Sequence, residues 1–258
     1  MENIIVTKKI QNPWRDLINS EKILSIDKEK IESYNEKYIG KKERQVSTFD
    51  FPEPFIGTPE ADVYVLLANP GRNIKKEEEL LKLVKEKGLE RKILQNLSHD
   101  FSNNEFPFYF LDPDFDEHPG GKWWQNAFKK LIKGDLERRK VIANEFFGIE
   151  LFGYHSMKCE RSLLYNSQYR LSSSEYSYHL VRNAITENKI IILARAVGDW
   201  FSKVPELREY RNCYFLASNR GIQFSNRTIS PGAYTEIEQI IQDRISNISK
   251  SDAQQKIQ

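Results

Sequence analysis

The chain has 258 residues, of which 39% are hydrophobic and 29% charged, so it is long enough for one large α/β domain with a substantial core. Its formal net charge of +2 excludes a strongly basic, nucleic-acid-coating protein; any contact with DNA must come from a local patch. No apolar run reaches membrane-spanning length. The first residues lack the basic end and cleavage site of a secretory signal, and we expect a cytoplasmic protein.

The N-terminal part, residues 1–48, is highly charged and predicts a helical extension. Within it, the segment PWRDLINSEKIL places Trp14, Leu17 and Ile18 on one helical face. A proline-rich loop follows, and the first clear strand is Val63–Leu67. A charged, periodic segment over 75–97 predicts two surface helices broken at Gly88.

The middle of the chain alternates between helical and strand patterns. A helix over Lys122–Ile132 should bury Trp124, Phe128, Leu131 and Ile132, and we expect Trp123 to be a core or loop residue as well. A second helix over 135–147 leads into a strand over 148–154, and a third helix covers 175–189. The uninterrupted apolar run at 190–194 is typical of a buried parallel strand.

The last strand covers 213–218 and precedes a helix over Ala233–Ile248, after which we expect residues 249–258 to be disordered. Strands separated by helices predict right-handed βαβ units. The sequence therefore predicts an α/β fold: a three-layer α/β/α domain over 49–248, with a central, mostly parallel four-stranded sheet, preceded by the helical extension.

Several kinds of site are excluded by the residues present. The two cysteines, Cys159 and Cys213, are too few for a four-cysteine metal site, and we expect both to be reduced. The sequence has neither a glycine-rich loop that ends in Lys-Ser/Thr nor a G-x-G-x-x-G pattern, the two glycine motifs that bind nucleotides. No serine lies in a nucleophile elbow. The acidic segment DPDFDEH does not match a calcium-binding loop. Such a loop needs Gly at its sixth position and Glu at its twelfth, where this chain has Glu117 and Trp123. We therefore expect no metal and no cofactor.

Three of the four expected strands end in a polar cluster: NPGRN, YHSMK and SNRG. Each cluster on its own is also typical of a simple turn. Because the carboxyl ends of parallel strands lie along one edge of a sheet, these three clusters could share a single cleft. The sequence therefore places the candidate site at this edge.

The strand-end motifs resemble those of the uracil-DNA glycosylase superfamily, particularly its mismatch-specific uracil/thymine branch. LLANPGRN resembles the first motif of that family, and SNRGIQFS resembles a degenerate second motif. Between them, FPFYF, LFGYHS and IIILARAVGDWF follow in the family's chain order, so the resemblance covers roughly residues 50–245.

The resemblance implies a role for each matching residue. Asn69 stands where the family positions the hydrolytic water, and Asn219 where it contacts the flipped nucleotide and stabilises the departing base. Phe110 would stack on the base, with Phe108 or Tyr109 as alternatives. The resemblance places the following residues around the base: Ala68, Phe110, Tyr154, His155 and Ser156. The family usually reads the base with an asparagine, where this chain has Gly153 or Tyr154.

The resemblance also implies contacts with DNA, by Gly71, Arg72, Asn73, Ser218, Arg220, Ile222 and Phe224. Either Ile222 or Phe224 would be the wedge that fills the gap left in the duplex. Arg220 replaces the proline of the family's second motif.

We therefore expect a monomeric, monofunctional DNA glycosylase that excises a damaged, mismatched or modified pyrimidine by base flipping. Asn69 is neutral, so it can orient water but cannot take its proton as an aspartate would. A defence enzyme acting on the modified cytosines of phage DNA is one form of this hypothesis. The alternatives are a catalytically silent module that binds DNA or protein, and a hydrolase of free nucleosides.

Overall fold

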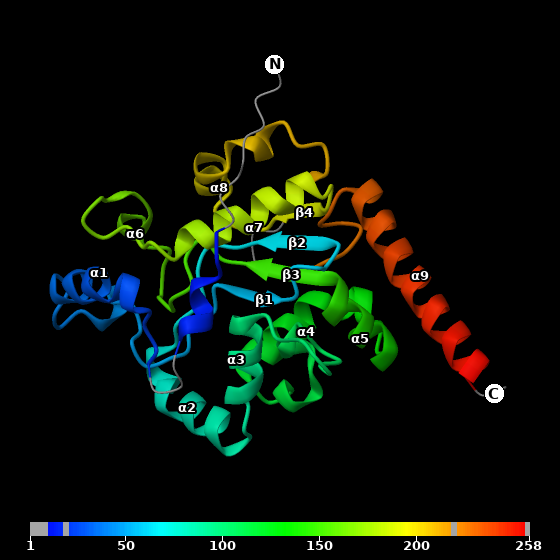
Figure 1. Cartoon of the computed structure of the whole chain (residues 1–258), viewed down its shortest axis with the longest axis horizontal. Helices are drawn as coiled ribbons and strands as arrows, with labels where there is room; N and C mark the ends of the chain where they lie inside the picture. The colour runs from blue at the N-terminus through cyan, green and yellow to red at the C-terminus, as the bar shows by residue number, and fades with distance from the viewer. Residues whose placement is uncertain (1–9, 18–20, 218–220, 256–258) are drawn as a thin grey trace.

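A five-stranded mixed sheet forms the centre of the molecule in the computed structural model, which describes residues 10–17, 21–217 and 221–255 (Figure 1). Its strand order is β1-β3-β2-β4-β5. The strands are β1 (Phe55–Gly57), β2 (Val63–Leu66), β3 (Phe146–Ile149), β4 (Ile190–Leu193) and β5 (Cys213–Phe215). Strands β2 to β5 run parallel, and β1 pairs antiparallel with β3. The predicted α/β class is confirmed.

The two central strands explain why the sheet was recognisable in the sequence. Every residue of β2 and β4 is buried, which is the pattern expected where a parallel sheet is covered on both faces. In the register of the sheet, Val65 of β2 lies between Gly148 of β3 and Ile192 of β4. The arrowheads of β2 and β3 point toward the side of the molecule on which α1 and α2 lie (Figure 1).

The expectation of four strands was wrong, because the sheet has a fifth strand in the segment expected to be a loop. Strand β1 has only three residues and follows Pro54, so it carries no alternating pattern. Its pairing partners, such as Ile149 for Phe55, lie far away in the sequence. Strand β3 begins at Phe146, earlier than predicted, since two buried phenylalanines that fit a helical pattern belong to the strand.

The α-helices occur mostly in segments that were predicted to be helical, but the short helices over Ser162–Tyr165 and Val197–Lys203 were not predicted. The α-helices are α1 (Ser25–Glu36), α2 (Glu77–Glu86), α3 (Glu90–Ser98), α4 (Pro119–Ile132), α5 (Leu136–Glu145), α6 (Ser162–Tyr165), α7 (Ser174–Thr186), α8 (Val197–Lys203) and α9 (Pro231–Gln255). The break at Gly88 is confirmed: this residue has φ of 63° and separates α2 from α3. The four predicted core residues of α4 are buried. Helix α9 continues past Ile248 to Gln255, so the part of the expected disordered tail up to Gln255 is helical.

The starts of two helices follow from local capping. Asp135 accepts a hydrogen bond from the Arg138 backbone N–H at the start of α5 (2.9 Å). At the start of α4, His118 Nδ1 accepts from the Gly120 N–H (3.1 Å), and Pro119 occupies the first helical position. This cap fixes the His118 ring at a place that matters for the site described below.

The N-terminal extension contains α1 but is less helical than predicted. Around Trp14, the described part of the predicted helix is a single 3-10 turn, Pro13–Asp16, and Ile18 lies outside the described residues. The extension is joined to the domain by Asp27, which is fully buried. Its carboxylate accepts hydrogen bonds from the Tyr154 hydroxyl (3.0 Å) and from the Ser172 and Ser173 N–H groups (2.7 and 3.3 Å).

Two further expectations concern the described residues. Both cysteines are free thiols, as predicted. Among the helices of the described chain, none combines the length and the apolar character needed to cross a membrane.

Candidate functional site

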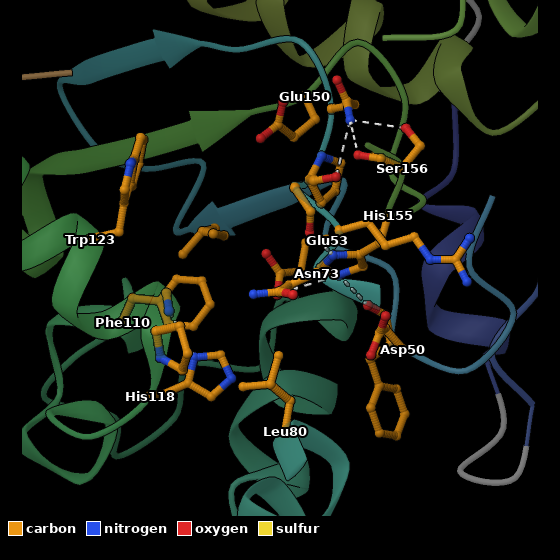
Figure 2. Close-up of a pocket in the computed structure, with 18 of the residues that line it drawn as sticks. Asp50, Glu53, Asn73, Leu80, Phe110, His118, Trp123, Glu150, His155 and Ser156 are labelled. Carbon is orange, nitrogen blue, oxygen red and sulfur yellow. Dashed lines mark hydrogen bonds and ion pairs between the residues drawn. The ribbon is translucent and has the colours of Figure 1, made fainter. Parts of the chain in front are cut away.

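A cavity of about 620 Å³ opens at the carboxyl ends of β2 and β3. The residues that follow β2, from Leu67 to Asn73, form one wall, and Glu150 with His155–Met157 after β3 forms another. The loop before β1, the start of α4 and Leu80 of α2 form further parts of the wall (Figure 2). Leu81, Val84, Ile93 and Arg195 after β4 also line the cavity. Two of the three predicted polar clusters, NPGRN and YHSMK, therefore meet, and an isolated parallel bridge joins Gly71 to Ser156.

The Asn69 side chain is held at the edge of the cavity by its amide nitrogen. Nδ2 donates to the Ser156 carbonyl oxygen and to its Oγ, both at 2.9 Å, and it lies 3.1 Å from the Pro70 carbonyl oxygen. A carbonyl can only accept, so these partners fix which end of the amide is nitrogen. Among the described residues no donor satisfies Oδ1, which is left free to accept a hydrogen bond from a ligand or a water.

The His155 ring ties three segments together. Its Nδ1 lies 2.8 Å from the Gly71 carbonyl oxygen, and its Nε2 lies 3.0 Å from that of Phe51 and 3.6 Å from Glu53 Oε1. Both ring nitrogens therefore face protein acceptors. The ring lines the cavity, but its polar atoms are used to position the cavity walls.

The predicted stacking residue, Phe110, lines the cavity and is packed face to face with His118, at 5.2 Å between ring centroids and 24° between planes. Phe108 and Tyr109, the two alternatives, are core residues that do not line it. Because His118 Nδ1 is an acceptor in the helix cap, the neutral ring carries its proton on Nε2. Burial lowers the pKa of His118 to about 4, so the ring is neutral near pH 7.

Replacing Gly120 with alanine should displace the Phe110 ring. A Cβ at Gly120 would lie 2.4 to 2.9 Å from three ring atoms of Phe110, and the buried ring has little room to move. We expect a loss of about 1–3 kcal/mol in the free energy of unfolding, as for other overpacked sites. Thermal unfolding measures it, with Gly198→Ala as the matched control, since a Cβ there meets nothing within 4 Å. Equal stability of the two variants would contradict the packing described.

Sequence reasoning missed the four carboxyl side chains that line the cavity, Asp50, Glu53, Glu77 and Glu150, of which Glu53 and Glu150 have shifted pKa values. Burial raises the pKa of Glu53, an effect that the nearby His155 partly offsets. Burial, reinforced by the neighbouring Glu53, raises the pKa of Glu150 well above its ordinary range. Glu150 Oε2 is shielded from solvent and has no hydrogen-bond partner.

The raised pKa of Glu150 gives stability a specific pH dependence. The folded chain keeps this proton to a higher pH than the unfolded chain, so raising the pH above about 4.5 deprotonates only the unfolded chain and lowers the free energy of unfolding. The Glu150→Gln variant has no carboxyl at this position, so its free energy of unfolding lacks this pH-dependent decrease. Its stability relative to wild type should therefore increase from pH 4.5 to 8, as measured by urea unfolding at several pH values. If the free energies of unfolding of the two proteins changed in parallel with pH, the pKa of Glu150 would not be raised in the folded chain.

The cationic side chains at the cavity differ in their availability. The side chain of Arg72 is only 3% exposed: it pairs with Glu77 and donates to the backbone carbonyl oxygens of Lys42 (3.1 Å) and Gln45 (2.8 Å). These contacts hold the N-terminal extension against the domain. Arg195 makes no ion pair among the described residues; its guanidinium donates to the Ala194 carbonyl oxygen (2.8 Å). Sequence analysis did not single out Arg195, although it follows a buried strand.

The position of Trp123 also differs from expectation. Trp123 lines the cavity and is 43% exposed, so the expectation that it is a core or loop anchor was wrong, while Trp124 is buried. The helical period places them on adjacent faces of α4, and their rings meet edge to face.

Most of the predicted site residues do line the cavity: Ala68, Asn69, Gly71, Arg72, Asn73, Phe110, His155, Ser156 and Ile222. Two do not. Tyr154 is buried against the extension, where its hydroxyl bonds to Asp27, and Phe224 stacks on Phe128 in the core (4.6 Å). Both are large aromatic residues that serve packing rather than the cavity. The predicted residues Ser218, Asn219 and Arg220 lie outside the described residues.

In the described part of the chain, no three His, Cys, Asp or Glu side chains are grouped so that they could hold a metal ion. The cavity instead offers a free amide oxygen, a ring stack, a neutral histidine donor and two protonatable carboxyls. Comparison of the chain with protein-family models, with curated proteins and with solved structures found no match.

Proposed function

We propose that the protein is a DNA glycosylase that hydrolyses the N-glycosidic bond of a damaged, mismatched or modified pyrimidine. The observation that carries the proposal is Asn69, whose Nδ2 is anchored on Ser156 while its Oδ1 stays free at the strand-end cavity. The sequence resemblance gave this residue the role of positioning water, and the contacts suit that role.

The rest of the cavity supports the same chemistry. A base in duplex DNA must be unstacked and held between an aromatic face and hydrogen-bonding groups before its sugar bond can be attacked. Phe110 lines the cavity with its ring stacked on His118, and we assign it the aromatic contact to the base although it is only 3% exposed. Charge that develops on the leaving base is stabilised by pre-aimed donors, and we assign this role to His118 Nε2–H and to Asn219.

The proposal also covers the layers of the fold, the oligomeric state and the location of the protein. We propose a three-layer α/β/α arrangement around the sheet and a monomer that acts on DNA without a cofactor in the cytoplasm. Arg195, a cation at the cavity without an ion pair among the described residues, is the candidate contact to a DNA phosphate.

An abasic-site assay tests the proposal. Purified protein is incubated with duplex and single-stranded DNA carrying uracil, G·T and G·U mismatches, or modified cytosines, and abasic sites are revealed by alkaline cleavage. We expect abasic sites on at least one of these DNAs. Binding of DNA without abasic sites would favour a silent module, and release of bases from free nucleosides alone would favour a nucleoside hydrolase; either result overturns the proposal.

A further inference from the structure

Four carboxyl side chains line the cavity: Asp50, Glu53, Glu77 and Glu150. Glu77 pairs with Arg72, and Asp50 accepts a hydrogen bond from Ser47 Oγ (2.9 Å). The other two, Glu53 and Glu150, are brought together by the edge of the sheet. The Glu53 N–H donates to the Gly153 carbonyl oxygen (2.7 Å), and the Glu150 N–H donates to that of Pro54 (2.9 Å). These bonds place the loop before β1 alongside the segment after β3. Both side chains then line the same cavity as Asn69 and Phe110 (Figure 2).

Neither carboxyl is used to hold the fold together. A carboxyl that serves structure alone is paired or fully hydrogen-bonded, because an unpartnered buried oxygen costs free energy. Glu150 Oε2 is buried and has no partner, and no described side chain makes an ion pair with Glu150. Among the residues that the structure describes, only His155 lies within ion-pair distance of Glu53, at 3.6 Å. Both side chains line the cavity, so a ligand that enters it can contact their carboxyl groups.

The chemistry of a carboxyl pair selects among the bases. The Watson–Crick edge of cytosine carries an amino group beside an unprotonated ring nitrogen, N3. A carboxylate accepts from such an amino group, and a carboxylic acid donates to such a nitrogen. Uracil presents an oxygen in place of the amino group, and that oxygen would face the lone pairs of a carboxylate.

We infer that Glu53 and Glu150 read the amino group and N3 of a cytosine-type base, and that Glu150 donates its proton to N3 as the base leaves. This inference rests on the proposed glycosylase function. Glu53, oriented by His155, accepts from the amino group. Glu150 is the catalytic acid, because it touches the base.

The reaction balances as a hydrolysis. The bond between C1′ and N1 breaks, and its electron pair passes to the base, where the proton of Glu150 neutralises it at N3. The water held by Asn69 forms the new bond to C1′. The proton that this water releases restores Glu150 through solvent. Cytosine is a poor leaving group as an anion, and this proton transfer lets it leave as a neutral molecule.

The volume of the cavity extends the inference to substituted cytosines. At about 620 Å³ it lies in the range that accommodates drug-sized ligands, and it is larger than a bare pyrimidine requires. We therefore expect the cytosine-type substrate to carry a substituent at C5, such as a hydroxymethyl or a glucosylated hydroxymethyl group.

The test uses matched pairs of duplexes that differ only at C4 of the base. Cytosine, 5-hydroxymethylcytosine and its glucosylated form are each compared with the uracil counterpart, in single turnover with the full chain. We expect the cytosine member of at least one pair to be released at least about 10-fold faster than its partner. Equal or faster release of the uracil members would overturn the inference and leave the glycosylase proposal intact; no abasic sites on any duplex would overturn both.

The Glu150→Gln variant separates proton transfer from binding. Glutamine keeps one acceptor and one donor in the same shape but cannot give up a proton to N3. We expect the saturating rate on the cytosine substrate to fall by about 10²-fold or more, as for loss of a general acid, with DNA affinity changed by less than about two-fold. Glu137→Gln makes the same chemical change at an exposed carboxyl of α5 and should leave both unchanged. A folded Glu150→Gln protein that retains the wild-type rate would overturn the role of Glu150.

Discussion

The Asn69→Ala variant should lose about 10²–10³-fold in the single-turnover rate of base release, the effect expected when one pre-aimed polar group is removed from an active site. The loss should fall on the rate at saturation and spare DNA affinity, because the proposed function gives Asn69 Oδ1 the role of orienting the attacking water and assigns phosphate binding to other residues. The measurement is the rate of abasic-site formation on the best substrate of the panel.

Asn144→Ala is the matched control for this variant. Asn144 is an exposed residue of α5 whose amide bonds only to nearby backbone carbonyl oxygens. Its replacement should leave the rate unchanged. If Asn69→Ala kept the full rate, the water-positioning role would be excluded, and NPGRN would be no more than the turn that ends β2.

Replacing Asp27 with alanine should destabilise the protein by about 3 kcal/mol or more, since each buried donor left without a partner costs about 1–3 kcal/mol. Three donors would lose this acceptor: the Tyr154 hydroxyl and two backbone N–H groups. Chemical unfolding measures the loss. Asp27→Asn keeps one oxygen and should cost less than alanine.

Asp16→Ala is the control for Asp27→Ala, because Asp16 is an exposed aspartate of the same extension. It should change the free energy of unfolding by less than about 0.5 kcal/mol. Similar stability of the Asp16 and Asp27 variants would show that the extension is not held by the buried carboxylate.

The sequence was informative where local pattern decides structure. The apolar runs of β2 and β4 have no alternative to burial, and the polar residues that end β2 had to lie at the sheet edge, which is where Asn69 lies. The helices were similarly evident from periodicity and from the break at Gly88.

What the sequence could not predict depends on contacts between distant segments. Glu150 was indistinguishable from any polar residue of a strand pattern, and Glu53 lay in a proline-rich loop. Only the hydrogen bonds between 53–54 and 150–153 bring these carboxyls into one cavity. Tyr154 and Phe224 were misplaced for the same reason: an aromatic residue beside a motif suits a pocket and a core equally well, and packing against Asp27 and Phe128 decides between them.

The walls of the cavity come from segments that are far apart in the chain, from Asp50 to Ile222. During synthesis, β1 leaves the ribosome long before its partner β3, and the pairing of Phe55 with Ile149 has to wait for it. Ile222, which also lines the cavity, emerges later still. If the proposed function is right, a growing chain therefore has no competent active site until nearly all of it has been made, and truncated products of translation carry no base-removing activity.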